Sequence, residues 1–174
     1  MNTTTSPRPA KHPRFVAQAR ADTPLGPVTL VATADGLAGV WFDGQAHHPG
    51  PLAAPLDASQ THIAQARREL DEYFGGRRTR FDVALDPLGT DFQHGVWTAL
   101  ARIAHGRTTS YGEIASRLGR AAAGRAVGAA VGRNPLSVIV PCHRVLGRDG
   151  ALTGYAGGLA RKQALLRLEG AVGR

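Results

Sequence analysis

The only cysteine of the chain, Cys142, is preceded by Pro141 and followed by His143 and Arg144. A thiolate attacks electrophiles where a thiol does not, and a neighbouring imidazole or guanidinium group favours the thiolate. Cys142 is therefore a candidate nucleophile, with His143 as its candidate base. A free cysteine can equally be an inert, buried small hydrophobe, so the rest of the chain has to decide between the two interpretations.

The charge of the chain indicates an acidic partner. Its formal net charge is +8 over 174 residues. A positive field concentrates polyanions, and contacts to phosphates supply most sequence-independent affinity for nucleic acid. We therefore expect nucleic acid as the partner, with a merely solvated basic face as the alternative. The excess lies in the second half, at Arg102, Arg107, Arg117, Arg120, Arg125, Arg133 and Arg144.

The cysteine count and the hydropathy pattern exclude several classes of protein. One cysteine cannot form an intrachain disulfide or a cysteine-cluster zinc site, and an unpaired thiol fits a reducing compartment. No apolar run reaches the length of a membrane span, and the N-terminus lacks the apolar core of a signal peptide. We expect a cytoplasmic protein without membrane contact. His47 and His48 have no other clustered ligand beside them, so no metal site is expected.

The first half has the pattern of a small sheet with one helix. Pro24-Leu25-Gly26 and Asp35-Gly36 are turn signals between short apolar runs, which predicts an antiparallel three-stranded meander. Apolar residues at helical spacing predict a helix over Asp57–Phe74 that packs on this meander. The predicted strands are Phe15–Ala21, Val28–Ala32 and Leu37–Phe42, with one more at Phe81–Leu85 and a loop over Gln45–Pro55.

The second half is predicted to be mainly helical. The fold class is therefore α/β of the α+β kind, divided into a flexible tail (residues 1–13), a sheet-and-helix domain (14–88) and a C-terminal domain (89–174). The predicted helices are Asp91–His105, Tyr111–Leu118, Ala121–Gly132 and Leu159–Glu169, with a short apolar strand at Leu136–Val140.

The helix predicted over Ala121–Gly132 is unusually smooth. With the helix before it, it has the proportions of a helix-turn-helix, and it occupies the recognition position. It offers one long cationic side chain, Arg125, among alanines and glycines. Helices that read bases in the major groove carry more polar side chains, whereas minor-groove proteins combine close backbone approach with an inserted wedge. Tight packing against another helix is the alternative.

Several motifs occur together in this half: Tyr111-Gly112-Glu113-Ile114-Ala115, Arg125-Ala126-Val127-Gly128, Asn134-Pro135, Pro141 to Val145, Tyr155 to Gly158 and Glu169-Gly170. In this order they resemble the O6-alkylguanine-DNA alkyltransferases, over roughly residues 91 to 170. The resemblance implies a DNA repair protein that rotates an O6-alkylated guanine out of the duplex and moves the alkyl group onto its own cysteine, without a cofactor. Extrusion of the base costs a few kcal/mol, and less for a damaged base.

The resemblance also implies roles for the central residues. Cys142 is the alkyl acceptor, and His143 acts on it through a water and is oriented by Glu169. Arg125 fills the place that the base vacates, and Tyr111 assists rotation and hydrogen bonds the leaving guanine. Independently, the helical angle places Glu169 between Leu165 and Leu166, which predicts that it points to the apolar side, as Lys162 would; a surface glutamate is the alternative.

The remaining pocket residues follow from the same resemblance. The carbonyls of Cys142 and Val145 accept hydrogen bonds from the guanine amine, and Tyr155 forms a wall of the pocket. The N–H of Ala156 faces O6, and Gly157 completes this segment. Asn134 ties the recognition helix to the turn that carries the cysteine. Some family members have serine at the position of Ala156, so a hydroxyl contact is missing here.

One departure from the family and two rival functions remain. Some members hold zinc in the N-terminal domain through cysteine, which this chain lacks there, so no metal is expected. The expected partner is double-stranded DNA with O6-alkylguanine, bound by a monomer, with cooperative assembly on DNA left open. A transcription regulator that reads sequence with the helix-turn-helix is one rival. A cysteine hydrolase that turns over repeatedly with Cys142 and His143 is the other.

Overall fold

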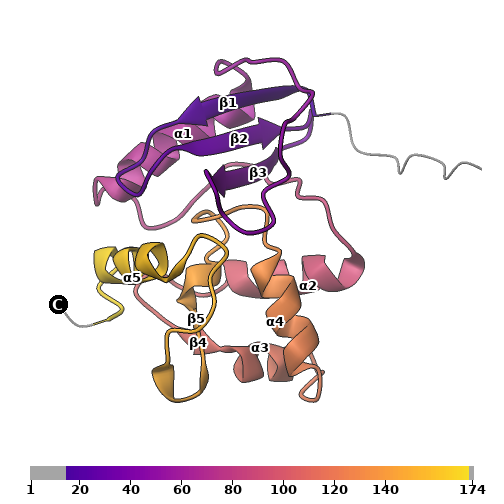
Figure 1. The fold of residues 1–174 in the computed structure, drawn as a ribbon, viewed down its shortest axis with the longest axis vertical. Helices are drawn as coiled ribbons and strands as arrows, with labels where there is room; N and C mark the ends of the chain where they lie inside the picture. Colours follow the sequence, from indigo (N-terminus) through magenta and orange to yellow (C-terminus); the bar gives the residue numbers. More distant parts are fainter. Residues whose placement is uncertain (1–14, 173–174) are drawn as a thin grey trace, which may run out of the picture.

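The structure is a computed structural model, and it describes residues 15–172. The predicted α+β class is confirmed, because a three-stranded antiparallel sheet with one helix precedes a mainly helical part (Figure 1). The predicted tail over residues 1–13 lies outside the described residues. None of the helices between residues 15 and 172 is long and apolar enough to cross a membrane.

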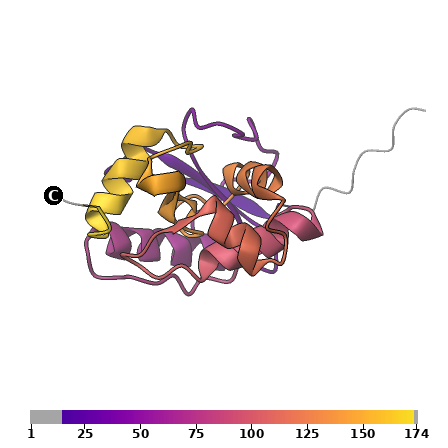
Figure 2. The ribbon, with the colours of Figure 1, turned by 90° about the horizontal axis from the view of Figure 1, so that it is seen from below.

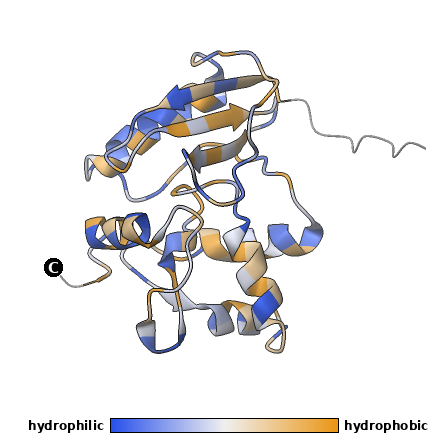
Figure 3. Cartoon of the chain, viewed as in Figure 1, coloured by the Kyte–Doolittle hydropathy of each residue, from blue (hydrophilic) through white to orange (hydrophobic). Residues whose placement is uncertain are grey.

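The sheet consists of β1 (Ala17–Ala21), β2 (Val28–Ala32) and β3 (Leu37–Phe42), in that order. Both connections are tight turns, and Gly26 closes the first with a φ of +113°, which a side chain would strain. Every residue of β2 and β3 is buried. Both strands are correspondingly coloured mainly as hydrophobic in Figure 3. Their side chains belong to two apolar clusters, so both faces of the sheet are covered.

Helix α1 (Thr61–Phe74) packs on all three strands. The side chain of Gln60 caps it by accepting hydrogen bonds from the N–H groups of His62 and Ile63. It begins later than predicted because Asp57 forms a local turn instead, in which its Oδ1 accepts the N–H of Ser59 at 2.9 Å. The predicted buried face is confirmed: it comprises Ile63, Ala66, Leu70 and Tyr73.

The strand predicted over Phe81–Leu85 is wrong. Leu85 forms only an isolated bridge with Leu37. The N–H groups of Asp82 and Val83 donate to the buried carboxylate of Glu69 rather than to another strand. A side chain of α1 thus replaces the backbone partner that a strand would need.

The C-terminal part contains α2 (Asp91–Ala101), α3 (Tyr111–Arg117), α4 (Gly124–Gly132) and α5 (Leu159–Leu168). Capping boxes start α2 and α3, and Trp97 of α2 donates its indole N–H to the carbonyl of Ala130 in α4 at 2.9 Å. Helix α4 begins after Ala123, because the N–H of Ala123 closes a turn onto Arg120. Viewed from below, one end of α5 lies beside α1, whereas α4 lies on the other side of the molecule from α1 (Figure 2).

Four short elements follow α4 or pair with the segment after it. They are the parallel strands β4 (Thr109–Ser110) and β5 (Val145–Leu146), and the 3-10 turn η1 (Cys142–Arg144); η2 (Arg148–Gly150) is a second such turn. The strand predicted over Leu136–Val140 is wrong, because Leu136 alone bridges to Val40 and Val138 has a φ of +72°. This segment is buried and folded into tight turns. Backbone hydrogen bonds with Val40 join its start to β3, and its apolar side chains belong to a cluster that runs through both halves of the chain.

Candidate active site

Cys142 is the first residue of η1 and is 6 % exposed. Cys142 lines a cavity of about 210 Å³. Elements from both halves of the chain form this cavity, so the thiol lies where a small molecule or a base could reach it. The other lining residues are Ala46, His47, Tyr111, Gly128, Val131, Gly132, Gly154, Tyr155 and Ala156.

His143 lies behind the cavity and is completely buried. Its Nε2 lies 2.8 Å from Oε1 of Glu169, whereas Nδ1 has no hydrogen-bond partner within residues 15–172. Burial lowers the pKa of His143 below its usual value, against the opposing effect of Glu169. The ring is therefore neutral at neutral pH. With the Nε2 proton directed at the carboxylate, Nδ1 keeps a free lone pair that can accept a proton.

Glu169 is held by three side chains. Besides His143, its carboxylate accepts the hydroxyl of Tyr73 at 2.6 Å, and Nε and Nη2 of Arg144 at 2.9 Å each. Burial alone would raise the pKa of Glu169, but these hydrogen bonds outweigh it and hold the pKa below its usual value. The prediction that Glu169 points to the apolar side is confirmed. Glu169 is thus a fixed anion that orients the imidazole.

The expectation that Arg144 favours the thiolate of Cys142 is wrong. The guanidinium of Arg144 is engaged by Glu169 and by the carbonyl of Ile103, on the other side of the turn. Burial raises the pKa of the Cys142 thiol. A hydrogen bond with Asn134, the charge of Lys162 and nearby backbone N–H groups oppose that rise. The resting thiol is therefore protonated and needs a base.

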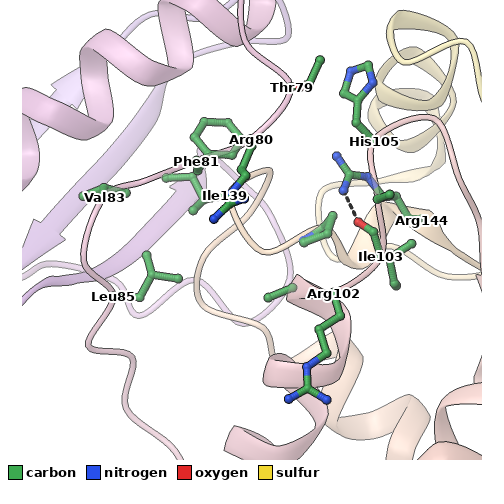
Figure 4. A pocket seen from close by; sticks show the side chains of 13 residues that line it. Thr79, Arg80, Phe81, Val83, Leu85, Arg102, Ile103, His105, Ile139 and Arg144 are labelled. Carbon is green, nitrogen blue, oxygen red and sulfur yellow. Dashed lines mark hydrogen bonds between the residues drawn. The ribbon is translucent and has the colours of Figure 1, made fainter.

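A larger cavity, of about 680 Å³, lies behind the same turn (Figure 4). It is lined by residues of the segments 79–85 and 101–105, together with Ile139, Pro141 and Arg144. None of its lining residues also lines the cavity at Cys142. Because Cys142 lines the smaller cavity and not the larger one, the smaller cavity is the candidate active site.

Comparison with known proteins agrees with this geometry. Residues 91–171 match the family model of the 6-O-methylguanine DNA methyltransferase DNA binding domain, and residues 17–87 match that of the ribonuclease-like domain of the same proteins. A methylated-DNA–protein-cysteine methyltransferase of Mycobacterium bovis is 48% identical over 148 residues, which cover 85% of this chain and 88% of the relative. The chain belongs to the 6-O-methylguanine DNA methyltransferase family. It is a DNA repair enzyme with alkyltransferase activity.

Further proteins of this methyltransferase family are similar to the chain. A protein of that name from Methanosarcina acetivorans is 46% identical, with 86% of this chain and 95% of the relative covered. The crystal structure of Mycobacterium tuberculosis OGT in complex with DNA has a TM-score of 0.80 and 46% identity, and covers 90% of this chain and 94% of that one. That structure shows the neighbour bound to DNA, and residues 91–171 of this chain match the DNA binding domain of the family.

The structure places Tyr111, Tyr155 and Ala156 of this methyltransferase around the thiol. Burial raises the pKa of the half-buried Tyr111 hydroxyl. Tyr155 lines the cavity with its ring, and its hydroxyl is buried without a partner within residues 15–172. The Ala156 carbonyl accepts the N–H of Ala46 at 2.9 Å. Gly157 lies close behind, where a Cβ would stand 2.7 Å from Cε1 of Tyr155.

Like His143, Glu169 and Gly157, three further predicted residues lie outside the lining of the cavity. Asn134, just after α4, donates from Nδ2 to the carbonyl of Val140 at 2.8 Å and so links the helix to the turn that carries the thiol. Val145 is completely buried, and its carbonyl accepts Nζ of Lys162 at 2.6 Å. Arg125 is exposed in the first turn of α4.

Two contributions from the N-terminal half have no recognisable signal in the sequence. Tyr73 was predicted only as a core residue of a helix, but its hydroxyl binds Glu169. His47 was predicted as a loop histidine; it is exposed, with a φ of +61°, and lines the cavity. Within residues 15–172, no three His, Cys, Asp or Glu side chains are grouped to hold a metal ion.

Proposed function

We propose that the chain transfers the alkyl group of O6-alkylguanine in double-stranded DNA to the sulfur of Cys142, once per molecule. The observation that carries this proposal is the position of the sole cysteine on a cavity, with the buried pair of His143 and Glu169 behind it. A cysteine that served only as core packing would not need this neighbourhood.

The chemistry balances with the residues present. The thiol proton passes to Nδ1 of His143 through one water, and Glu169 stabilises the imidazolium that forms. Sulfur then attacks the alkyl carbon, so that a C–S bond forms while the C–O6 bond breaks. The electron pair passes to the guanine, which takes up a proton from water and is hydrogen bonded by Tyr111, while the imidazolium of His143 returns the thiol proton to water. The product thioether has no leaving route, so each molecule acts once and needs no cofactor.

The target base has to leave the duplex to reach a thiol that is 6 % exposed. Helices α3 and α4 follow each other as a helix-turn-helix would, and α4 is pale or orange over most of its length in Figure 3. A helix with so little side-chain bulk can approach the minor groove closely, and the exposed Arg125 then fills the space in the stack. The carbonyls of Cys142 and Val145 and the N–H of Ala156 receive the guanine.

The transfer is tested by intact-mass measurement. After incubation with duplex DNA that contains O6-methylguanine, the protein gains the mass of one methyl group, localised to Cys142 by peptide mapping. Cys142→Ser, folded as the wild type, gains nothing. Repeated turnover of an ester or amide with an unchanged protein mass would instead support the hydrolase.

The stack-filling role of Arg125 is tested by comparing two substrates. Arg125→Ala slows repair in duplex DNA far more than the reaction with free O6-alkylguanine base, because the free base needs no extrusion. Arg117→Ala removes another exposed charge, from α3, and is the matched control. Equal losses on both substrates would exclude a role in extrusion.

A further inference from the structure

His47 lines the active-site cavity, but the transfer chemistry described so far does not use it. It lines the cavity together with Ala46, and both residues belong to the loop after β3. His47 is also exposed, so it lies at the mouth of the cavity. Its φ of +61° is in the left-handed region, which a residue with a side chain seldom adopts. Such a conformation persists only where the surroundings hold it, and it is common at functional sites.

The loop that carries His47 is held from both halves of the chain. The side chain of Gln45 is buried, and its Oε1 accepts a backbone N–H of β3 at 2.8 Å and the hydroxyl of Ser137 at 3.0 Å. The next residue, Ala46, donates its N–H to the carbonyl of Ala156 at 2.9 Å. These hydrogen bonds fix the backbone on the N-terminal side of His47, and so fix its place at the cavity.

The neighbouring histidine, His48, has a different place. Its Nδ1 accepts the N–H of Gly50 at 3.0 Å, and its ring centroid lies 6.1 Å from that of Trp41. It is not one of the residues that line the cavity. The two histidines share a loop and differ in their access to the cavity, so His48 is a matched control for His47.

The place of the alkyl group follows from the proposed binding of the guanine. With the N–H of Ala156 facing O6, the group that O6 carries lies at the same end of the cavity, between the sulfur of Cys142 and the wall beside Ala156. Ala46, which is hydrogen bonded to Ala156, and His47 form that wall. An alkyl group that extends beyond its first carbon therefore runs towards Ala46 and His47.

The cavity offers little room for such an extension. Its volume of about 210 Å³ is below the roughly 300–1,000 Å³ of ordinary ligand pockets. A methyl group adds one carbon to the guanine, whereas a benzyl group adds a whole aromatic ring. That ring would have to project through the mouth at which His47 lies.

We propose that His47 determines which alkyl groups the protein accepts. Its imidazole closes the end of the cavity that holds the alkyl group, so that methyl and other short groups are transferred readily and aromatic groups such as benzyl are transferred slowly. The inference rests on the proposed function and deepens it, because it names the class of substrate. The bond changes stay the same for every group: a C–S bond forms and the C–O6 bond breaks.

The first test compares O6-methylguanine with O6-benzylguanine in duplex DNA under single-turnover conditions. His47→Gly removes the imidazole, and glycine adopts a positive φ without strain, so this variant should fold. The ratio of the benzyl rate to the methyl rate is expected to rise by about tenfold or more, because contacts with one or two carbon atoms in a pocket change selectivity by this factor. His47→Asn, with a shorter side chain that also tolerates this φ, should give a smaller rise. His48→Ala should leave the ratio at the wild-type value.

The second test measures the same ratio with the two free bases, which need neither DNA binding nor extrusion. The rise in His47→Gly should persist, because the alkyl group meets the same wall. A rise confined to duplex DNA would mean that His47 acts through a contact with the DNA, and would overturn the proposal. An unchanged ratio in His47→Gly, shown to be folded by thermal unfolding, would overturn it as well.

A third measurement separates this inference from the function on which it rests. Cys142 is alkylated by iodoacetamide and by the bulkier N-benzyliodoacetamide, without any guanine. His47→Gly should raise the rate of the bulky reagent relative to the small one, because both reach the sulfur through the same mouth. An equal ratio in the variant and the wild type overturns the closure of the cavity by His47. A wild-type protein that gains no methyl group from O6-methylguanine overturns the proposed function instead, and the two reagents still test the closure.

Discussion

Replacement of Glu169 is expected to lower the stability of the fold strongly. The carboxylate of Glu169 accepts four hydrogen bonds, from Tyr73, His143 and Arg144, and its side chain is fully buried. Glu169→Gln keeps the shape but leaves the guanidinium of Arg144 buried without a counter-charge. Breaking a buried ion pair in this way costs about 3–5 kcal/mol of the free energy of unfolding. For a chain of this length, that lowers the melting temperature by roughly 6–20 °C.

The loss is measured by urea unfolding, with the fluorescence of the buried Trp41 and Trp97 as the signal. Asp71→Asn, an exposed carboxylate on α1, is the control and should change the free energy of unfolding by less than about 0.5 kcal/mol. A loss below about 1 kcal/mol for Glu169→Gln would refute the view that this carboxylate balances a buried charge.

The pH dependence of the same difference is a second check. The pKa of Glu169 is lower in the folded protein than in the unfolded chain. Its contribution is therefore fully present above the unfolded pKa of about 4.3, and is lost as the pH falls towards the folded value. The difference between the wild type and Glu169→Gln should be largest at pH 7 and shrink below about pH 4.3. A difference that stayed constant from pH 7 to pH 3.5 would contradict this assignment.

Three further variants probe the surroundings of the site. Tyr73→Phe removes one hydrogen bond from Glu169 but keeps the charge, so urea unfolding should show a loss of about 1.5–3 kcal/mol; no loss would mean that the bond contributes nothing. Gly157→Ala places a Cβ 2.7 Å from the Tyr155 ring, and should cost about 1–3 kcal/mol and slow single-turnover repair; wild-type values in both assays would show that the ring yields freely. Asn134→Ala leaves the buried N–H of Leu136 unpaired and removes a hydrogen bond that lowers the thiol pKa, so iodoacetamide should react more slowly at pH 7.5; an equal rate would exclude an effect of Asn134 on the thiol.

Helical periodicity predicted the parts of the molecule in which local pattern and tertiary packing agree. The buried face of α1 follows from the spacing of Ile63, Ala66 and Leu70, and the angle of Glu169 on α5 places it among apolar neighbours. Both inferences need only the geometry of one helix. Lys162 has the same angle and is buried as well, although its three acceptor carbonyls lie outside its own helix.

The two strands predicted from short apolar runs are wrong, because such a run forms a strand only where a backbone partner exists. The segment 136–140 has one bridge to β3 and then turns, with Val138 at positive φ. In the segment 81–85, the N–H groups of Asp82 and Val83 donate to the carboxylate of Glu69, and only Leu85 bridges to β3. In both places a contact far along the chain decides the conformation, and a single sequence does not contain that contact as a local pattern.

The N-terminal sheet and helix are part of the reaction site rather than an appendage to it. Tyr73 of α1 binds the carboxylate that orients His143, across 96 positions of sequence. Ala46 holds the carbonyl of Ala156, and the ring of Phe42 lies under the guanidinium of Arg161, 4.5 Å from its centroid. Residues of the N-terminal half therefore position both His143, through Glu169, and one wall of the cavity. A change in how the two halves pack would alter the reactivity of the thiol without any change at Cys142. The pKa of Cys142 is therefore a property of the whole fold.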